Sequence, residues 1–92
     1  MIMLLKLITG DDVVADVTIE GNEYSLKNPM RFMPAREGVG MMPLSFFAKP
    51  NVPIMITKDK IVFTTQVEDE IANAYNEKFG SGIVLPVSSL QL

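Results

Sequence analysis

The side chains of this 92-residue chain that could do chemistry are carboxylates, amines and hydroxyls, because it holds no histidine and no cysteine. Thiolate nucleophiles, Cys/His zinc sites and a histidine general base are therefore excluded. Serines and carboxylates remain, but none has a plausible base beside it in the sequence. The composition predicts a protein that is not an enzyme and that takes no cofactor, no metal and no small-molecule substrate.

Two short patterns could hold an ion. Asp11, Asp12 and Asp16 are the densest acidic cluster, but the first two lie at a predicted turn and the third faces outward from a predicted strand. We interpret them as a solvated polar edge, because a metal site needs several converging oxygens. The Gly-x-Gly within Pro34–Gly40 could cradle a phosphate. It opens no helix and no Gly-Lys-Ser/Thr follows it, so we interpret the segment as a hairpin loop.

The net charge of −3 is unevenly distributed along the chain. Seven acids and seven bases balance up to Thr65, and the net acidity lies after that residue. Proteins that wrap nucleic acid non-specifically usually carry a basic excess. Any nucleic-acid contact is therefore expected to be local.

The elements that must position these residues are mostly β-strands. Asp12–Glu20 and Glu23–Phe32 alternate apolar and polar residues, which predicts strands with one apolar face. Turns are predicted at Gly10 and at Gly21-Asn22. Pro29 predicts an edge position or a bulge, because proline donates no ladder hydrogen bond. The residues predicted to face inward from the second run are Tyr24, Leu26, Met30 and Phe32.

Further strands are predicted before and after this pair. The first is Met3–Thr9, and the apolar run Met41–Ala48 gives a fourth that Lys49-Pro50-Asn51 interrupts. Pro53–Thr57 and Lys60–Thr65 are short strands around a tight turn at residues 58–60. We expect five main strands followed by a helix, in a small, strongly bent, mainly β barrel.

One helix is predicted, over Val67–Phe79. Thr65 and Glu68 fit a capping box, and acids in the first turn suit the helix dipole. Gly80 is a natural C-terminal stop. The apolar stripe consists of Val67, Ile71, Ala74, Tyr75 and Phe79. We expect this stripe to pack on the barrel, and partner binding is the alternative.

The chain is long enough for one domain. We divide residues 1–92 into a barrel over 1–65, a helix over 66–80 and a tail over 81–92 that carries an apolar Ile83–Pro86 patch. No apolar run approaches the roughly 20 residues of a membrane span, and no signal-peptide pattern occurs. The expectation is a cytoplasmic protein without a membrane partner.

Three local matches resemble the Sm-like family, the Lsm and Hfq proteins. Residues 5–10, Leu-Lys-Leu-Ile-Thr-Gly, resemble its opening strand, and residues 21–24, Gly-Asn-Glu-Tyr, resemble its first motif. Residues 56–62, Ile-Thr-Lys-Asp-Lys-Ile-Val, resemble its second motif. Residues 75–84 also resemble small Sm-like proteins of large tailed phages of cyanobacteria, so the cytoplasm would be that of a host cell if the protein is phage-encoded. The resemblance implies a five-stranded Sm-like (SH3-like) barrel.

The resemblance also implies an RNA site. Tyr24 falls where the family stacks a uracil ring, and Asp59 falls on an aspartate that braces the motif loop. Leu26 and Thr57 replace the base-reading Asn and the base-covering Arg, and Lys58 replaces a glycine. A shifted register over Leu26–Asn28, as in the Hfq branch, restores an asparagine but leaves Tyr24 without its role. The candidate RNA-binding residues are Tyr24, Lys27, Asn28, Thr57, Lys58, Asp59 and Lys60.

Two functions follow as expectations. The first is a cyclic homo-oligomer that binds single-stranded, uridine-rich RNA with weak sequence discrimination. The second is an oligomeric structural or protein-interaction module without RNA, which the missing Asn and Arg and the surplus apolar surface favour. The residues expected at the interface between subunits are Met41, Met42, Leu44, Phe46, Phe47, Ile54 and Ile56.

Overall fold

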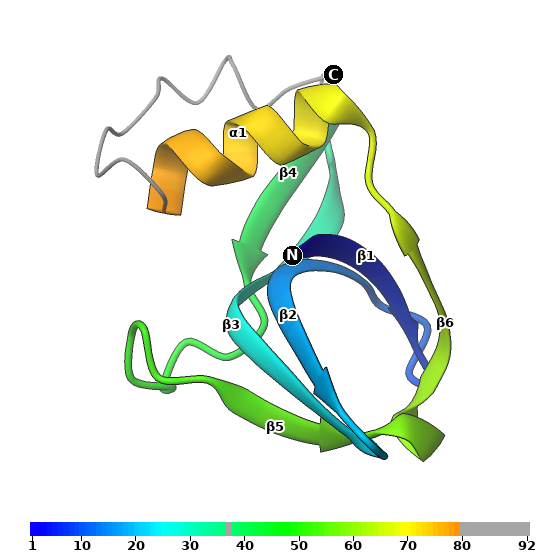
Figure 1. Ribbon diagram of the computed structural model, residues 1–92. Coiled ribbons are helices and arrows are strands. Elements are labelled where there is room, and N and C mark those ends of the chain that lie inside the picture. The colour runs from blue at the N-terminus through cyan, green and yellow to red at the C-terminus, as the bar shows by residue number, and fades with distance from the viewer. Residues whose placement is uncertain (37, 80–92) are drawn as a thin grey trace.

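The computed structural model of the chain describes residues 1–36 and 38–79. It is mainly β, with six antiparallel strands and a C-terminal helix (Figure 1). The strands are β1 (Ile2–Leu7), β2 (Asp12–Glu20), β3 (Glu23–Ala35), β4 (Gly38–Pro43), β5 (Ile54–Thr57) and β6 (Ile61–Gln66). A 3-10 turn, Lys58–Lys60, joins β5 to β6, and the helix is α1 (Asp69–Phe79).

The strands form one strongly curved sheet in the order β4-β3-β2-β1-β6, and β5 pairs with β3 on the edge opposite to β2. The prediction of five strands was wrong, because β3 is long enough to pair with two successive partners. Its first half pairs with β5 and its second half with β4. Among residues 1–36 and 38–79 no pairing joins β6 to β4 or β5, so the sheet does not close.

A bulge in the β2–β3 pair explains how one sheet contributes side chains to two separate hydrophobic cores, one on each of its faces. Val14 pairs with Met30 and Asp16 pairs with Lys27, so two residues of β3 face a single residue of β2. Because side chains alternate between faces, one extra residue reverses which face the rest of the strand presents. The prediction that Met30 faces the same side as Tyr24 was therefore wrong. Of the two alternatives predicted at Pro29, an edge position or a bulge, the bulge is confirmed.

The first core fills the inside of the curved sheet and the second lies between the sheet and α1. The buried residues of the first are Leu5, Val13, Ala15, Val17, Tyr24 and Leu26. Those of the second are Val14, Met30, Ile71 and Tyr75, with Phe32, Val67 and Phe79 packed against them. The apolar stripe of the predicted helix thus packs on the sheet as expected. Ile19, which the alternation in Asp12–Glu20 assigns to the apolar face, is 47% exposed near the end of β2.

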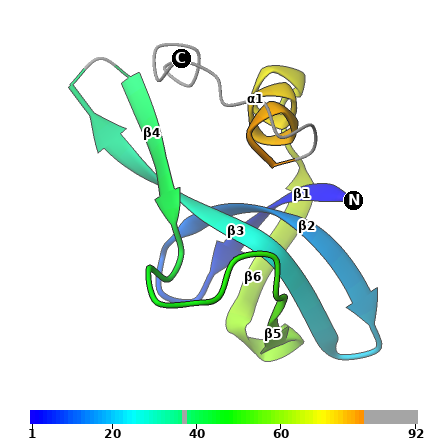
Figure 2. The ribbon, with the colours of Figure 1, turned by 90° about the vertical axis from the view of Figure 1, so that its left-hand side faces the viewer.

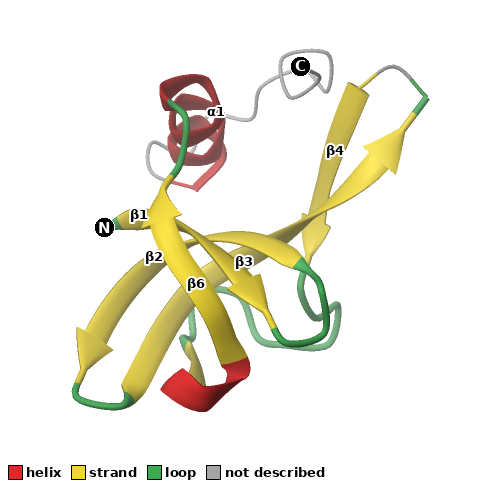
Figure 3. Ribbon diagram, turned by 90° about the vertical axis from the view of Figure 1, so that its right-hand side faces the viewer, coloured by secondary structure: helices red, strands yellow, loops and turns green. Residues whose placement is uncertain are grey.

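The second half of β3 and β4 form a hairpin that extends away from the body of the sheet (Figures 2 and 3). Ala35 pairs with Gly38, so most of the loop predicted over Pro34–Gly40 belongs to strands. The predicted strand Met41–Ala48 was largely wrong, because β4 ends at Pro43. Residues 44–53 form a loop that returns to β5.

The helix begins later than the capping-box pattern predicts. Thr65 lies in β6 and pairs with Leu4, so it cannot cap a helix. The amide of Ala72 instead donates to the carbonyl of Glu68 at 2.9 Å, which makes Glu68 the residue before the first helical turn. No helix of the described part is long and apolar enough to cross a membrane. The predicted tail, 81–92, lies outside the described residues.

Candidate nucleic-acid interface

Four of the candidate RNA-binding residues share one turn. Thr57 ends β5, and Lys58, Asp59 and Lys60 form the 3-10 turn that leads into β6. The amide of Lys58 donates to the carbonyl of Asn22 at 2.8 Å, which fixes this turn against the β2–β3 turn. Gly21, with φ +61°, is the first central residue of the β2–β3 turn, a conformation that glycine adopts without strain. Asn22, Thr57, Lys58 and Asp59 line an open hollow between the two turns.

The charges on the turn are partly paired. The Thr57 hydroxyl donates to Asp59 Oδ1, and Lys60 Nζ lies 3.5 Å from Asp59 Oδ2. The hydrogen bond from Thr57, aided by the Lys60 ammonium, holds the pKa of Asp59 below its ordinary value of 3.8. The Lys58 ammonium has no ion-pair partner among the described residues, and its side chain is exposed. As far as the described residues show, the turn thus presents one unpaired cation, Lys58, and one cation, Lys60, that is paired with Asp59, to an anionic ligand such as a phosphate.

Tyr24 lies next to this turn along the sheet but faces away from it. It pairs with Ile56, one residue before Thr57, and is only 9% exposed. Its ring belongs to the first core with Leu26 and Val17. Stacking of a base on Tyr24 stays a prediction, and it requires the ring to leave this core.

Lys27 and Asn28 belong to a different part of the molecule, at the β3 bulge. Asn28 has φ +50°, and its side-chain amide donates to Asn51 Oδ1 at 3.1 Å. In return the backbone amide of Asn51, itself at φ +64°, donates to Asn28 Oδ1 at 3.1 Å. This pair ties the 44–53 loop to β3. The Asn28 side chain is therefore already engaged, and the structure does not bring it together with the turn at residues 57–60.

The seven residues predicted at a subunit interface fall into three groups. Met41, Leu44 and Ile56 are half-buried against the chain's own cores. Met42 is half-buried on β4, and Phe47 is 99% exposed in the 44–53 loop. Phe46 and Ile54 line an apolar groove of about 210 Å³, bounded by β3, the 44–53 loop and the end of α1.

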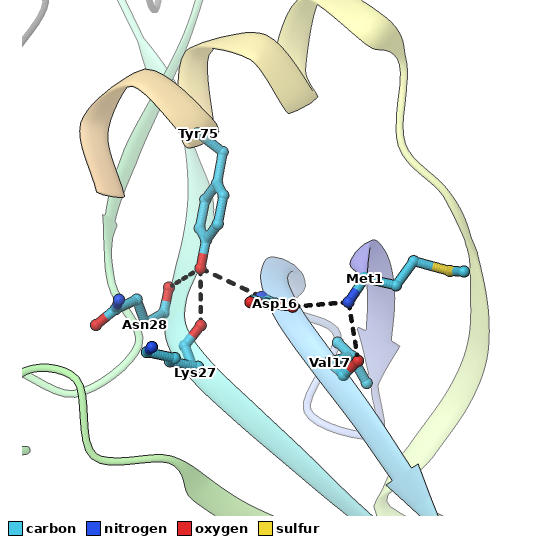
Figure 4. A network of polar contacts seen from close by, with 6 residues as sticks. All are labelled: Met1, Asp16, Val17, Lys27, Asn28 and Tyr75. Carbon is cyan, nitrogen blue, oxygen red and sulfur yellow. Dashed lines mark hydrogen bonds and ion pairs between the residues drawn. The ribbon is translucent and has the colours of Figure 1, made fainter. Parts of the chain in front are cut away.

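Sequence reasoning missed the polar role of Tyr75, which it placed only in an apolar stripe. Tyr75 is 2% exposed, and its hydroxyl reaches the bulge (Figure 4). The hydroxyl can donate its proton to the Lys27 carbonyl at 2.7 Å or to the Asn28 carbonyl at 2.9 Å. It also accepts a hydrogen bond from the Asp16 amide at 3.2 Å. The available signal was the residue type, since a buried tyrosine hydroxyl usually finds a partner.

The same network extends to the start of the chain in Figure 4. The Met1 amino group donates to Asp16 Oδ1 at 2.7 Å and to the Val17 carbonyl at 3.2 Å. Burial raises the pKa of Tyr75 to about 12, and the nearby Asp16 carboxylate adds to this although the Asp16 amide opposes it. The hydroxyl therefore stays protonated and serves as a structural hydrogen-bonding group.

Neither a metal site nor a known family is indicated. Within residues 1–36 and 38–79, no three acidic side chains are grouped so that they could hold a metal ion. Comparison with models of protein families and with curated proteins gives no match. The chemistry that the described residues offer is thus anion contact at the 57–60 turn and apolar contact at the groove.

Proposed function

We propose that this chain is an Sm-like subunit that assembles with copies of itself into a ring and binds single-stranded RNA weakly at the turn Thr57–Lys60. The observation that carries the proposal is a pair of open sheet edges joined by that turn. In the described residues β5 pairs only with β3, and β6 pairs only with β1. Each strand therefore has one free edge, and free edges favour pairing with another chain.

The resemblance to the Sm-like family implies a partner strand for each of these free edges. In that family the fourth strand of one subunit pairs with the fifth strand of its neighbour, and the resemblance implies that β5 and β6 would take those positions here. Such head-to-tail pairing closes into a ring when the rotation allows it. Met55 and Val62, which are 52% and 62% exposed on β5 and β6, would then meet across the new pairing.

Light scattering tests the assembly. We expect a mass several times the 10.2 kDa of one chain, and a single 10.2 kDa species at micromolar concentration would contradict the proposal. The double variant Met55→Lys/Val62→Lys places like charges on the two edges and should dissociate the ring. Ile19→Lys is the control, because it places a lysine at an exposed apolar residue of β2 that lies on neither free edge, and it should leave the mass unchanged.

RNA contact would come from the lysines of the turn. Repeated around a ring, Lys58 and Lys60 would give a local basic surface although the subunit is acidic overall. Leu26 and Thr57 offer neither the amide nor the guanidinium that recognises a base, so phosphate contacts should dominate. We expect binding to single-stranded, uridine-rich RNA at low salt, with little preference over adenine-rich RNA.

Fluorescence titrations at several salt concentrations test this part. Lys58→Ala/Lys60→Ala should weaken both RNAs equally and flatten the log–log salt slope by roughly 0.7 for each phosphate that is no longer neutralised. Lys49→Ala, which removes a lysine from the 44–53 loop, is the control and should change little. Equal slopes in the double variant and the wild type would refute the assignment.

A second function, an assembly module that does not bind RNA, is favoured by two observations. Tyr24 is only 9% exposed, and Lys60 shares its charge with Asp59 at 3.5 Å. Absence of binding to both RNAs at low salt, from a chain that still forms an oligomer, would establish this second function over the first.

A further inference from the structure

The apolar groove has the character of a contact site. It lies between Pro29 and Met30 of β3, Phe46 and Val52 of the 44–53 loop, and Phe79 at the end of α1. Phe46 is 65% exposed and Val52 is 52% exposed, so apolar side chains remain open to water along its rim. Among the described residues that line it, Lys49 alone is charged.

The size and polarity of the groove indicate what it can hold. Its volume of about 210 Å³ is below the roughly 300–1,000 Å³ of pockets for drug-sized ligands. The amide of Asn28, which would be the polar anchor, is already hydrogen-bonded to Asn51. A short apolar peptide segment fits these properties better than a nucleotide or a polar metabolite.

The chain itself carries such a segment directly after the groove. Phe79 both lines the groove and is the last described residue. Residues 80–92 lie outside the described residues, and their sequence holds no charged side chain. After Gly80-Ser81-Gly82 it continues Ile83-Val84-Leu85-Pro86, which can be buried without the cost of removing a charge from water.

Chain connectivity favours this occupant over any separate one. Ile83 follows Phe79 by four residues, which span at most roughly 14 Å, so the apolar segment is within reach of the groove that Phe79 lines. A tether this short gives an effective concentration in the millimolar range. A free partner would have to bind strongly enough to displace a segment that is always present.

We propose that Ile83–Pro86 docks in the apolar groove of its own chain and covers Phe46 and Val52. Docking would bury the exposed rim and hold the end of α1 against the 44–53 loop. The proposal does not depend on RNA binding, because none of the groove residues belongs to the turn at 57–60. It does not require a ring either, because the segment and the groove belong to one chain.

Paramagnetic relaxation on the full chain tests the docking. The sequence contains no cysteine, so Ser88→Cys gives a single attachment site for a nitroxide two residues beyond Pro86. We expect the amide signals of Ala48, Val52 and Ile54 to lose most of their intensity with the oxidised label relative to the reduced one. The amides of β6 should keep theirs.

Two variants of the labelled chain should abolish the effect. Leu85→Asp places a charge on the proposed docking segment, and Val52→Asp places one on the groove rim. Ile19→Asp is the matched control, because it introduces the same charge at an apolar residue of β2 that is 47% exposed, close to the 52% of Val52, and broadening at the groove should persist. Signals that are the same in the labelled chain with and without Leu85→Asp would overturn the proposal.

Mixing the spin-labelled chain with an isotope-labelled chain that lacks the nitroxide separates contacts within one chain from contacts between copies. We expect no broadening of the groove signals in this mixture. Broadening there would mean that the segment docks on a neighbouring copy, and it would overturn docking within the same chain.

Discussion

Replacing Tyr75 with phenylalanine should destabilise the fold by about 1–3 kcal/mol without changing its architecture. The substitution removes one oxygen and keeps the ring, which is 2% exposed in the second core. That oxygen accepts from the Asp16 amide at 3.2 Å and donates to the Lys27 carbonyl at 2.7 Å. Without it the Asp16 amide and the carbonyls at the bulge lose a partner where water has little access.

The magnitude follows from the groups left unpaired. A buried donor or acceptor without a partner costs about 1–3 kcal/mol, whereas the apolar contacts of the ring are kept. The Asn28 carbonyl, 2.9 Å from the hydroxyl, shares the single proton with Lys27, so the carbonyls together lose only one bond. A loss of about 2 kcal/mol should lower the Tm of a domain of this size by roughly 8–16 °C.

Urea denaturation followed by circular dichroism measures the loss. The midpoint should fall and the m-value should stay unchanged, because the surface exposed on unfolding is the same. Tyr24→Phe is the matched control, since it removes the same oxygen from a tyrosine that is 9% exposed and makes no hydrogen bond with its hydroxyl among the described residues. Equal midpoints for the two variants would refute the structural role of the Tyr75 hydroxyl.

Three further outcomes are expected. Burial raises the pKa of Tyr75 to about 12 from 10.0, so the unfolded chain loses this proton at a lower pH than the folded chain. The free energy of unfolding should therefore fall by up to about 2.7 kcal/mol between pH 10 and 12. Urea denaturation of Tyr75→Phe at each pH should not show this part of the fall. An NMR titration should place the pKa of Asp59 below 3.8, and Thr57→Val should raise it. The stability that the Asp59 carboxylate contributes is then present above pH 3.8 and is lost as the pH falls through the lower pKa of the folded chain. An unchanged pKa of Asp59 in Thr57→Val would contradict the role of the Thr57 hydrogen bond. Asn51→Ala should be less stable than Asn51→Gly in urea by about 1 kcal/mol, because Asn51 has φ +64°; equal midpoints would contradict that strain.

Local patterns in the sequence predicted the parts of the fold that local rules control. Alternation identified β2 and the first half of β3, and Pro29 indicated the bulge. The pattern could not show that the bulge would reverse the face of Met30, because that depends on the register with Val14. Tertiary pairing also overrode local preference at Thr65, which joins β6 although its sequence suits a helix cap.

The candidate site was predictable to a similar degree. Lys58 and Asp59 lie on one turn because they are neighbours in sequence, and no long-range information was needed. Tyr24 was harder, because an alternating pattern does not say whether an inward ring stays accessible. The partners of the Tyr75 hydroxyl could not be predicted, since they are backbone groups at a bulge and all of them lie far away in the chain. Asp16, for example, is 59 residues away.

The pairing of β1 with β6 has a consequence for how the chain folds. Leu5 pairs with Thr64, so the sheet can be completed only after nearly all of the described chain has been synthesised. Contacts between such distant residues carry a large loop-closure entropy and slow folding. Until β6 arrives, one edge of β1 is free to pair with other nascent chains. Lys6, the fifth of the six residues of this otherwise apolar strand, is a residue of the kind that discourages edge-to-edge aggregation during this interval.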